Sequence, residues 1–264
     1  MKHIAIYCVN YHSYDSLEKY LLSIDRAAQK SQEPLTLSVF VADNTVPCVP
    51  VSYEPQHFSL RVLPTGENKG YFGAVHYLMR LMSPLEYDYC IVSNVDVLLD
   101  STFFTNLCTW KPDETVGWIA PEIYSKSLGF DFNPQAVVRY SLTKMRILRL
   151  LFKYPWMLRM KQKLLHVYKN IESIPSGPIY AGHGSFIILT KLYFSQCGII
   201  NYPIFLYGEE IYLAETCRQH HIQIIYEPKI KVIDIGRVST GNIPFRQYCK
   251  YNFQAISHIL NTYY

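Results

Sequence analysis

The sequence predicts an α/β fold in which helices flank a mostly parallel, twisted sheet. Short apolar runs rich in β-branched residues, at 4–9, 37–41, 60–63 and 90–92, have the length and composition of buried strands. Between them, residues 11–24 and 72–82 carry apolar side chains at helical spacing. Strands that alternate with helices form parallel sheets, which bind ligands at the carboxyl ends of their strands. A functional site is therefore expected at those ends.

The second half of the chain contains a basic, apolar-rich stretch and then returns to strands and a helix. Residues 142–168 are interrupted by Pro155, which predicts two helices that meet at the proline. Further strands are predicted at 185–189, 222–226 and 230–233, and a helix opens at 208 and runs through 218. With 264 residues, of which 49% are hydrophobic, the chain has enough apolar surface for one large domain.

The cysteines and the N-terminal residues bear on where the protein works. The seven cysteines are odd in number and scattered, without a C-x-x-C pair, which argues against a disulfide framework and a structural zinc site. The first residues are too short and too quickly polar for a signal peptide, and no stretch reaches about 18 apolar residues. We expect a reduced cytoplasmic protein that neither crosses a membrane nor is secreted by this route.

Polar residues follow the predicted strand at 90–92, in the order Ser93-Asn94-Val95-Asp96. Because strand side chains alternate, Asn94 and Asp96 are expected to point the same way and to present an amide oxygen and a carboxylate to a divalent cation or a ribose. The alternative is that Asp96 caps the following turn.

Several other short motifs occur in a fixed order along residues 4–240. They are Val9-Asn10-Tyr11, Val41-Ala42-Asp43-Asn44, residues 67–74 (ENKGYFGA), Gly182-His183-Gly184-Ser185 and residues 205–213 (FLYGEEIYL). Together with Ser93 to Asp96, they resemble the family 2 inverting glycosyltransferases of the GT-A fold, a Rossmann-like fold, and particularly the rhamnosyltransferase-like branch. The resemblance implies a hexosyl- or deoxyhexosyltransferase whose donor is a nucleoside-diphosphate sugar.

The resemblance assigns the donor to the motifs of the first half, residues 1–125. It implies that Asp43 accepts the imide hydrogen of a uracil or thymine base, which favours UDP or dTDP, and that the turn holding Asn68, Gly70 and Gly73 lies against the nucleotide sugar. Asn10 and Asn94 complete the expected donor-binding set. The alternatives from the residues alone are an Asx-turn at Asp43 and a helix cap at Asn68.

The resemblance also implies a divalent cation, Mn²⁺ or Mg²⁺, that neutralises the departing diphosphate. Asp96 matches the last residue of the family's Asp-x-Asp signature, in which Asn94 replaces the first Asp and removes one charge. Asp234 stands where many members have a histidine ligand. A carboxylate is a hard oxygen ligand, so Asp234 is a second metal candidate, and a loop-capping role is the alternative.

The acceptor side is expected in residues 176–264. Glu209-Glu210 matches the family's Glu-Asp pair, whose second carboxylate is the general base on the acceptor hydroxyl, and this makes Glu210 the catalytic candidate. Glu209 and His183 are expected to bind substrate. The alternatives are that both glutamates favour the dipole of a helix N-terminus and that His183 is structural.

The segment 126–175 is expected to be a basic helical region. Between Asp131 and Glu172 lie nine Lys and Arg residues and no acidic residue. Interleaved with leucines and aromatic residues, this pattern suits an interfacial helix on anionic lipid at the inner face of the plasma membrane. The alternative is an ordinary helix pair that covers the site. Nucleic acid is not expected as a partner, because no nucleic-acid-binding fold accompanies the basic segment.

The expected function is transfer of a sugar to a hydroxyl of a lipid-linked glycan in cell-surface polysaccharide synthesis, by a single GT-A domain covering residues 1–264. Two alternatives are open. Substitutions at Asn94, Glu210 and Asp234 suggest a degenerate, non-catalytic glycan-binding or complex-forming subunit. A sugar nucleotidyltransferase shares a related sheet, but it needs a Gly-rich basic loop after the first strand, which residues 9–13 do not supply.

Overall fold

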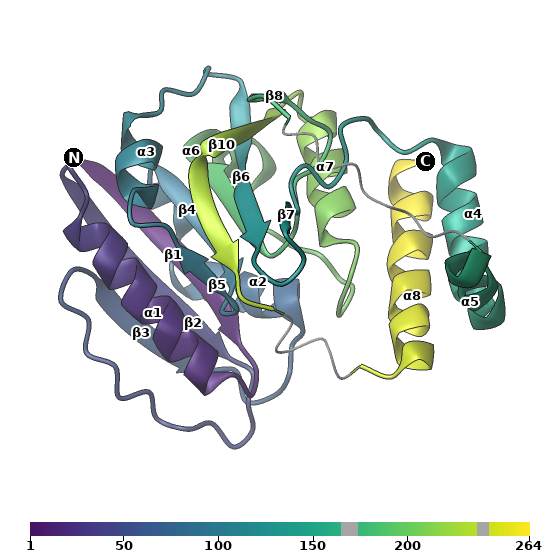
Figure 1. Cartoon of the computed structure of the whole chain (residues 1–264), viewed down its shortest axis with the longest axis horizontal. Helices are drawn as coiled ribbons and strands as arrows, with labels where there is room; N and C mark the ends of the chain where they lie inside the picture. Colours follow the sequence, from purple (N-terminus) through teal and green to yellow (C-terminus); the bar gives the residue numbers. More distant parts are fainter. Residues whose placement is uncertain (165–173, 237–242) are drawn as a thin grey trace.

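The computed structural model describes residues 1–164, 174–236 and 243–264, and it confirms the predicted α/β fold (Figure 1). The strands are β1 (Lys2–Asn10), β2 (Leu35–Asp43), β3 (Ser59–Pro64), β4 (Tyr89–Asn94), β5 (Val97–Leu99), β6 (Val116–Ser125), β7 (Phe130–Asp131), β8 (Gly177–Pro178), β9 (Phe186–Thr190) and β10 (Gln223–Asp234). The helices are α1 (Tyr14–Gln29), α2 (Tyr71–Leu81), η1 (Pro84–Glu86), α3 (Phe103–Thr109), α4 (Leu142–Lys153), α5 (Pro155–Leu164), α6 (Lys191–Cys197), α7 (Glu209–Gln219) and α8 (Phe245–Tyr263).

One sheet runs through the molecule in the order β3-β2-β1-β4-β9-β6-β10-β5. β3, β2, β1 and β4 are parallel, β9 runs against both β4 and β6, and β10 is parallel to β6. Strands from the two halves of the sequence therefore share one sheet. The carboxyl ends of β2, β1 and β4 meet at one edge, where parallel sheets bind ligands.

Helices cover both faces of the sheet. α1 and α3 pack on one face through Leu17, Leu21 and Phe103, and α2, α6 and α7 pack on the other. α1 follows the sequence pattern because Leu17, Leu21 and Ile24, at helical spacing, are buried against the sheet. The core is thus two apolar layers, one on each side of the central strands.

A third group of helices, α4, α5 and α8, packs together to one side of the sheet (Figure 1). α4 ends at Lys153 and α5 begins at Pro155, so the prediction of two helices that meet at this proline is confirmed. The part of the predicted stretch at 165–168 lies outside the described residues. Within the described ranges, no helix is both long and apolar enough to cross a membrane.

The assignments from the sequence differ from the structure in two ways. The strands predicted at 222–226 and 230–233 are one strand, β10, whose register on β6 shifts between Glu227 and Lys231. The ladder is irregular at the residues between them, and the sequence pattern shows a break there. Several elements were not predicted from the sequence: β5, β6, β7, β8, η1, α3, α6 and α8.

Candidate functional site

The strand registers align three of the predicted residues at the carboxyl edge of the sheet. In the β1–β2 ladder Asn10 lies opposite Asp43, and in the β1–β4 ladder Val9 lies opposite Asn94. Asp43, Asn10 and Asn94 therefore end three neighbouring strands at nearly the same level, which is where the sequence placed the donor.

Asp43 is held by its neighbours and is 1% exposed. Its Oδ1 accepts hydrogen bonds from Asn10 Nδ2 at 3.1 Å and from the Thr45 amide at 3.1 Å, and its Oδ2 accepts one from the Tyr14 hydroxyl at 2.7 Å. The bond to Thr45 is the Asx-turn that the sequence offered as an alternative, so that turn is present. A contact between Asp43 and a nucleobase stays a prediction.

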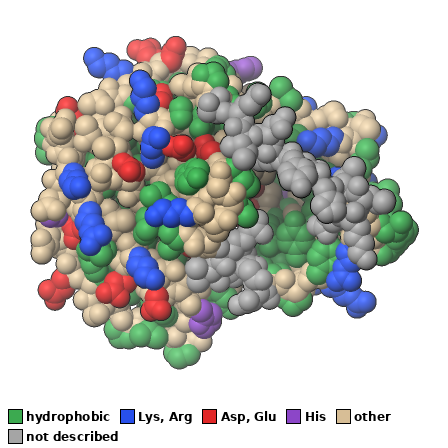
Figure 2. All heavy atoms as spheres, viewed as in Figure 1, with side chains coloured by type: hydrophobic (Ala, Val, Ile, Leu, Met, Phe, Trp, Pro, Cys, Tyr) green, Lys and Arg blue, Asp and Glu red, His purple; other side chains and the backbone are tan. Residues whose placement is uncertain are grey.

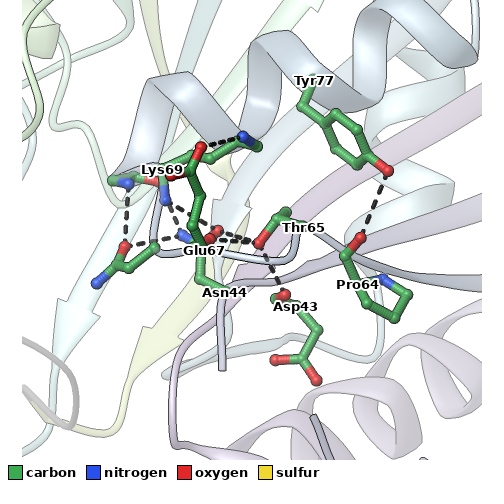
Figure 3. A network of polar contacts seen from close by, with 9 residues as sticks. Asp43, Asn44, Pro64, Thr65, Glu67, Lys69 and Tyr77 are labelled. Carbon is green, nitrogen blue, oxygen red and sulfur yellow. Dashed lines mark hydrogen bonds and ion pairs between the residues drawn. The ribbon is translucent and has the colours of Figure 1, made fainter. Parts of the chain in front are cut away.

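The loop after β3 is tied to the end of β2 by side chains (Figure 3). Asn44 Nδ2 donates to Asn68 Oδ1 at 3.2 Å and to the Gly70 carbonyl at 3.0 Å, and the Thr65 hydroxyl lies 3.0 Å from the Asp43 carbonyl oxygen. Asn68 Oδ1 accepts the Gly70 amide at 3.0 Å. The alternative that Asn68 caps the helix is wrong, because Gly70 is the N-cap of α2 and no side chain caps the helix.

The two glycines of this motif differ in what their surroundings require. Gly70 has φ +73°, and a Cβ there would lie 2.0 Å from the Phe205 carbonyl oxygen, so both the backbone and the packing demand glycine. A Cβ on Gly73 would meet only Lys69 Cβ, at 3.5 Å. In residues 1–164, 174–236 and 243–264 no neighbour requires glycine at position 73, so there is space for a ligand to approach the backbone at the first turn of α2.

The two predicted metal ligands lie on adjacent segments. β5 runs antiparallel to the end of β10, Asp234 pairs with Val97, and the Ile235 amide donates to the Asp96 carbonyl oxygen at 3.1 Å. Each aspartate is 7% exposed, and Asp234 Oδ2 accepts the Ser125 hydroxyl at 3.1 Å. β4 ends at Asn94, whereas Asp96 lies in the bend that follows the strand. The alternation of strand side chains therefore does not determine the relative direction of Asn94 and Asp96, so that part of the sequence-based prediction is wrong.

These carboxylates fit a hard divalent cation. Carboxylate oxygens are the ligands that Mg²⁺ prefers, and Mg²⁺ completes its shell with water and substrate phosphates. Over residues 1–164, 174–236 and 243–264, no group of three or more His, Cys, Asp or Glu side chains is arranged to hold a metal. Any cation held by Asp96 and Asp234 would therefore depend on the diphosphate for further ligands.

Glu209 and Glu210 open α7 but have different surroundings. Glu209 is 6% exposed, and its Oε1 accepts the Tyr207 amide at 3.0 Å. Tyr207 and Gly208 both have positive φ, 71° and 85°, so two successive left-handed residues turn the chain into the helix. The Glu209 side chain thus stabilises the turn that precedes α7 by accepting the Tyr207 amide.

Glu210 instead reaches across to the predicted acceptor turn. Its Oε1 accepts the Gly184 amide at 3.2 Å, and a Cβ on Gly184 would lie 2.8 Å from the same oxygen, so only glycine permits this approach. Burial raises the pKa of Glu210. Burial, and next the charge of Glu210, raise the pKa of Glu209. A carboxylate with a raised pKa is a stronger base near neutral pH than an ordinary glutamate.

Tyr71 is a residue of this site that the sequence argument did not single out. Its hydroxyl donates to the Gly184 carbonyl oxygen at 2.9 Å, on the same peptide turn that binds Glu210. Burial is the main reason that the pKa of Tyr71 is raised, and the charges of Glu209, Glu210 and Asp96 add to it. Tyr71 therefore lies among the three carboxylates. The sequence feature that could have identified Tyr71 is its position directly after Gly70, at the start of a predicted helix.

His183 is fixed within the acceptor turn. Its amide donates to Asn133 Oδ1 at 2.7 Å, its Nδ1 accepts the Ser185 amide at 3.2 Å, and Phe132 stacks on its ring with centroids 4.9 Å apart. The Asn94 amide donates to the Ser185 carbonyl oxygen at 2.9 Å, so this turn adjoins the end of β4. These contacts show that His183 has a structural role, which was the alternative given from the sequence. A contact between His183 and an acceptor stays a prediction.

Comparison with known proteins gives a match in structure only. No protein-family model matches the chain, and no curated protein sequence matches it significantly. A mannosyltransferase from Pyrobaculum calidifontis, solved with GDP-mannose and Mn²⁺, superposes with a TM-score of 0.51 at 12% identity, over 98% of this chain and 70% of its own.

Two further solved structures agree with this match. GalNAc-T7 with UDP, GalNAc and Mn²⁺ gives a TM-score of 0.57 at 11% identity over 92% of this chain, which spans 45% of the GalNAc-T7 chain. The catalytic domain of Drosophila β1,4-galactosyltransferase 7 with xylobiose gives 0.51 at 10% identity, over 95% of this chain and 79% of its own. These neighbours do not single out the rhamnosyltransferase-like branch. The chain therefore has the fold of the GT-A glycosyltransferases.

Proposed function

We propose that the protein is an inverting glycosyltransferase that moves a hexosyl or deoxyhexosyl group from a nucleoside-diphosphate sugar to a hydroxyl group. The observation that carries the proposal is the Glu210 carboxylate, held at the Gly184 amide beside the strand end that bears Asn94 and Asp96. A half-buried carboxylate with a raised pKa, next to a polar strand edge in a glycosyltransferase fold, has the properties of a general base.

In the proposed reaction Glu210 removes the proton of the acceptor hydroxyl as its oxygen attacks the anomeric carbon. The bond to the diphosphate breaks on the opposite face, so one displacement inverts the configuration. Tyr71 donates to the carbonyl oxygen of Gly184, whose amide donates to Glu210, and Tyr71 thereby helps to fix the residue that orients the base. A divalent cation at Asp96 and Asp234 would supply positive charge to the diphosphate.

The donor and acceptor are narrower proposals. Asp43 at the β2 end is the reason to favour UDP or dTDP, because a carboxylate accepts the imide hydrogen that uracil and thymine carry. The acceptor is proposed to be a lipid-linked glycan in cell-surface polysaccharide synthesis, because the basic segment 126–175 has the pattern of a membrane-interfacial region. A cytoplasmic location at the inner face of the plasma membrane stays a prediction from the sequence.

The test is a donor screen on the full chain. UDP-, dTDP- and GDP-sugars are incubated with and without Mn²⁺, release of the nucleoside diphosphate is followed, and NMR identifies the anomer first formed. We expect metal-dependent turnover of a uridine or thymidine donor with inversion, which Glu210→Gln removes. Binding of a donor without turnover would support the non-catalytic subunit instead, and retention of configuration would contradict the base role.

A further inference from the structure

The helices α4 and α5 have apolar side chains on two sides, and among the described residues one of these sides packs against α8. Met145 lies in a buried cluster with Ile256, Ile259 and Leu260 of α8. Leu151 and Leu158 are buried with Cys249 of the same helix. These contacts attach the pair to α8, so the apolar residues that point elsewhere are not needed for this attachment.

Large apolar side chains are exposed on the outward side. Their exposed fractions are 53% for Ile147, 46% for Leu150, 40% for Tyr154, 61% for Trp156 and 53% for Met160. Ile147 and Leu150 on α4 and Tyr154 at its C-cap are spaced i, i+3 and i+7, and the two on α5 are spaced i and i+4, so each set forms a stripe along its helix. We call these five residues the outer stripe.

Basic side chains flank the outer stripe without acidic partners nearby in sequence. Nine of the chain's 25 Lys and Arg residues, and none of its 21 Asp and Glu residues, fall between Asp131 and Glu172. Arg146, Lys153 and Lys161 are exposed beside the stripe. In Figure 2, basic and hydrophobic side chains lie side by side at the right-hand edge, where Figure 1 places α4 and α5.

Some of these cations lie over aromatic rings. The Lys153 ammonium lies 5.5 Å from the Tyr154 ring centroid, and the Arg159 guanidinium lies 4.6 Å from that of Phe245. A ring does not neutralise a charge, so the positive charge of this surface is available to a partner.

The helix pair also adjoins the candidate base. Tyr140 directly precedes the cap of α4, and its pKa is raised by burial and then by the charge of Glu210. On the other side, Tyr248 of α8 packs edge-on against Tyr207 with centroids 5.2 Å apart, two residues before Glu209. Whatever binds the outer stripe is therefore brought to the acceptor side of the site.

We propose that the outer stripe and its basic flank dock on an anionic phospholipid bilayer, with the two helices lying in the plane of the interface. Amphipathic helices bind anionic bilayers when Lys and Arg surround Trp, Tyr and aliphatic side chains. The docking itself does not depend on the proposed function. The consequence for catalysis rests on the proposed function: the hydroxyl of an acceptor anchored in the same bilayer would be presented to Glu210.

The experiment is co-sedimentation of the full chain with vesicles. Phosphatidylcholine vesicles are compared with vesicles that contain phosphatidylglycerol as a third of the lipid, at low and physiological salt. We expect binding to the anionic vesicles alone, weakening as salt rises because the charges are screened over about 8 Å at physiological salt. Replacing Arg146, Lys153 and Lys161 by Glu should lower vesicle binding by about 100-fold or more, since each basic residue contributes about 1 kcal/mol.

The matched control reverses three exposed lysines elsewhere, Lys30, Lys111 and Lys126, and should leave binding nearly unchanged. Trp156→Ser should weaken binding at every salt concentration, because it removes apolar insertion rather than charge. Absence of vesicle binding, equal binding to neutral vesicles, or equal losses in the two triple variants would overturn the proposal. Hydrolysis of the soluble donor should be unchanged in the first triple variant, so failure of docking and failure of the proposed activity are distinguishable.

Discussion

The two sides of the candidate site hold their carboxylates in opposite ways. On the donor side, Asp43 accepts three hydrogen bonds from its neighbours. On the acceptor side, Glu209 and Glu210 each accept one backbone amide from outside the helix, lie beside each other and have raised pKa values. Hydrogen bonds from three neighbours hold the Asp43 carboxylate in place. A carboxylate that is removed from solvent and held by backbone amides alone is costly to keep charged, and such groups are concentrated where proton transfer occurs.

Among the variants that test the two sides of the site, Asp96→Ala is expected to have the largest effect, which is on metal-dependent donor affinity. Asp96→Ala removes one of two carboxylates available to a cation, so the increase in donor affinity produced by Mn²⁺ should be lost altogether, while the fold is kept. Isothermal calorimetry with and without Mn²⁺ measures this. Asp234→Ala should have a smaller effect, and Asp113→Ala, an exposed loop aspartate, serves as control. Unchanged metal-dependent affinity in Asp96→Ala would rule out this ligand.

The next largest effect concerns the base. Glu210→Gln keeps the shape and the acceptor for the Gly184 amide but cannot take a proton, so kcat should fall by about 10²-fold or more with donor affinity nearly unchanged. Glu209→Gln is the matched control, because it changes the adjacent residue in the same way. If Glu209→Gln lowers kcat more than Glu210→Gln does, the roles of the two glutamates are reversed.

Tyr71→Phe should have an intermediate effect. It deletes the hydroxyl that holds the Gly184 carbonyl, a hydrogen bond worth about 1 kcal/mol, so kcat should fall by about 5- to 10-fold with little change in the KM for the donor. Steady-state kinetics separates the two parameters. Tyr77→Phe, on the same helix but bonded to the Pro64 carbonyl, is the control. A loss confined to donor KM would place Tyr71 on the donor side instead.

The smallest effect is on stability. Since the pKa of Glu209 is raised by folding, the folded chain binds the proton more tightly than the unfolded chain. The contribution of Glu209 to stability is therefore greatest below the ordinary glutamate pKa and falls as the pH rises from that value toward the raised one. Glu209→Gln should flatten this fall, and urea unfolding at pH 5 and pH 8 measures it. A wild-type protein that gains stability over this range would contradict the assignment.

Most of the donor side could be predicted from the sequence, and less of the acceptor side. Apolar runs that end in polar residues located β2 and β4, because period and composition mark buried parallel strands. β6 was missed since it is buried on both faces and contains Pro121, so it shows neither alternation nor a clean apolar run. α8 was missed although Ile256, Ile259 and Leu260 have helical spacing, because its other residues are largely polar and aromatic.

The contacts within the site depend on tertiary structure. The sequence placed Glu210 at a helix start, but the Gly184 amide lies 26 residues away in the chain and meets Glu210 only through packing. Tyr71 likewise reaches Gly184 across 113 residues. Motif order indicates which residues share an edge of the sheet, but it does not specify which hydrogen bonds form there.

Gly70 connects two parts of the candidate site. It leaves no room for a side chain between the loop after β3 and the Phe205 carbonyl, so the loop assigned to the donor and the segment leading to α7 touch through their backbones. In the proposed function, this backbone contact connects the loop that would hold the donor to the segment that carries the candidate base, and Gly70 is the residue that permits it.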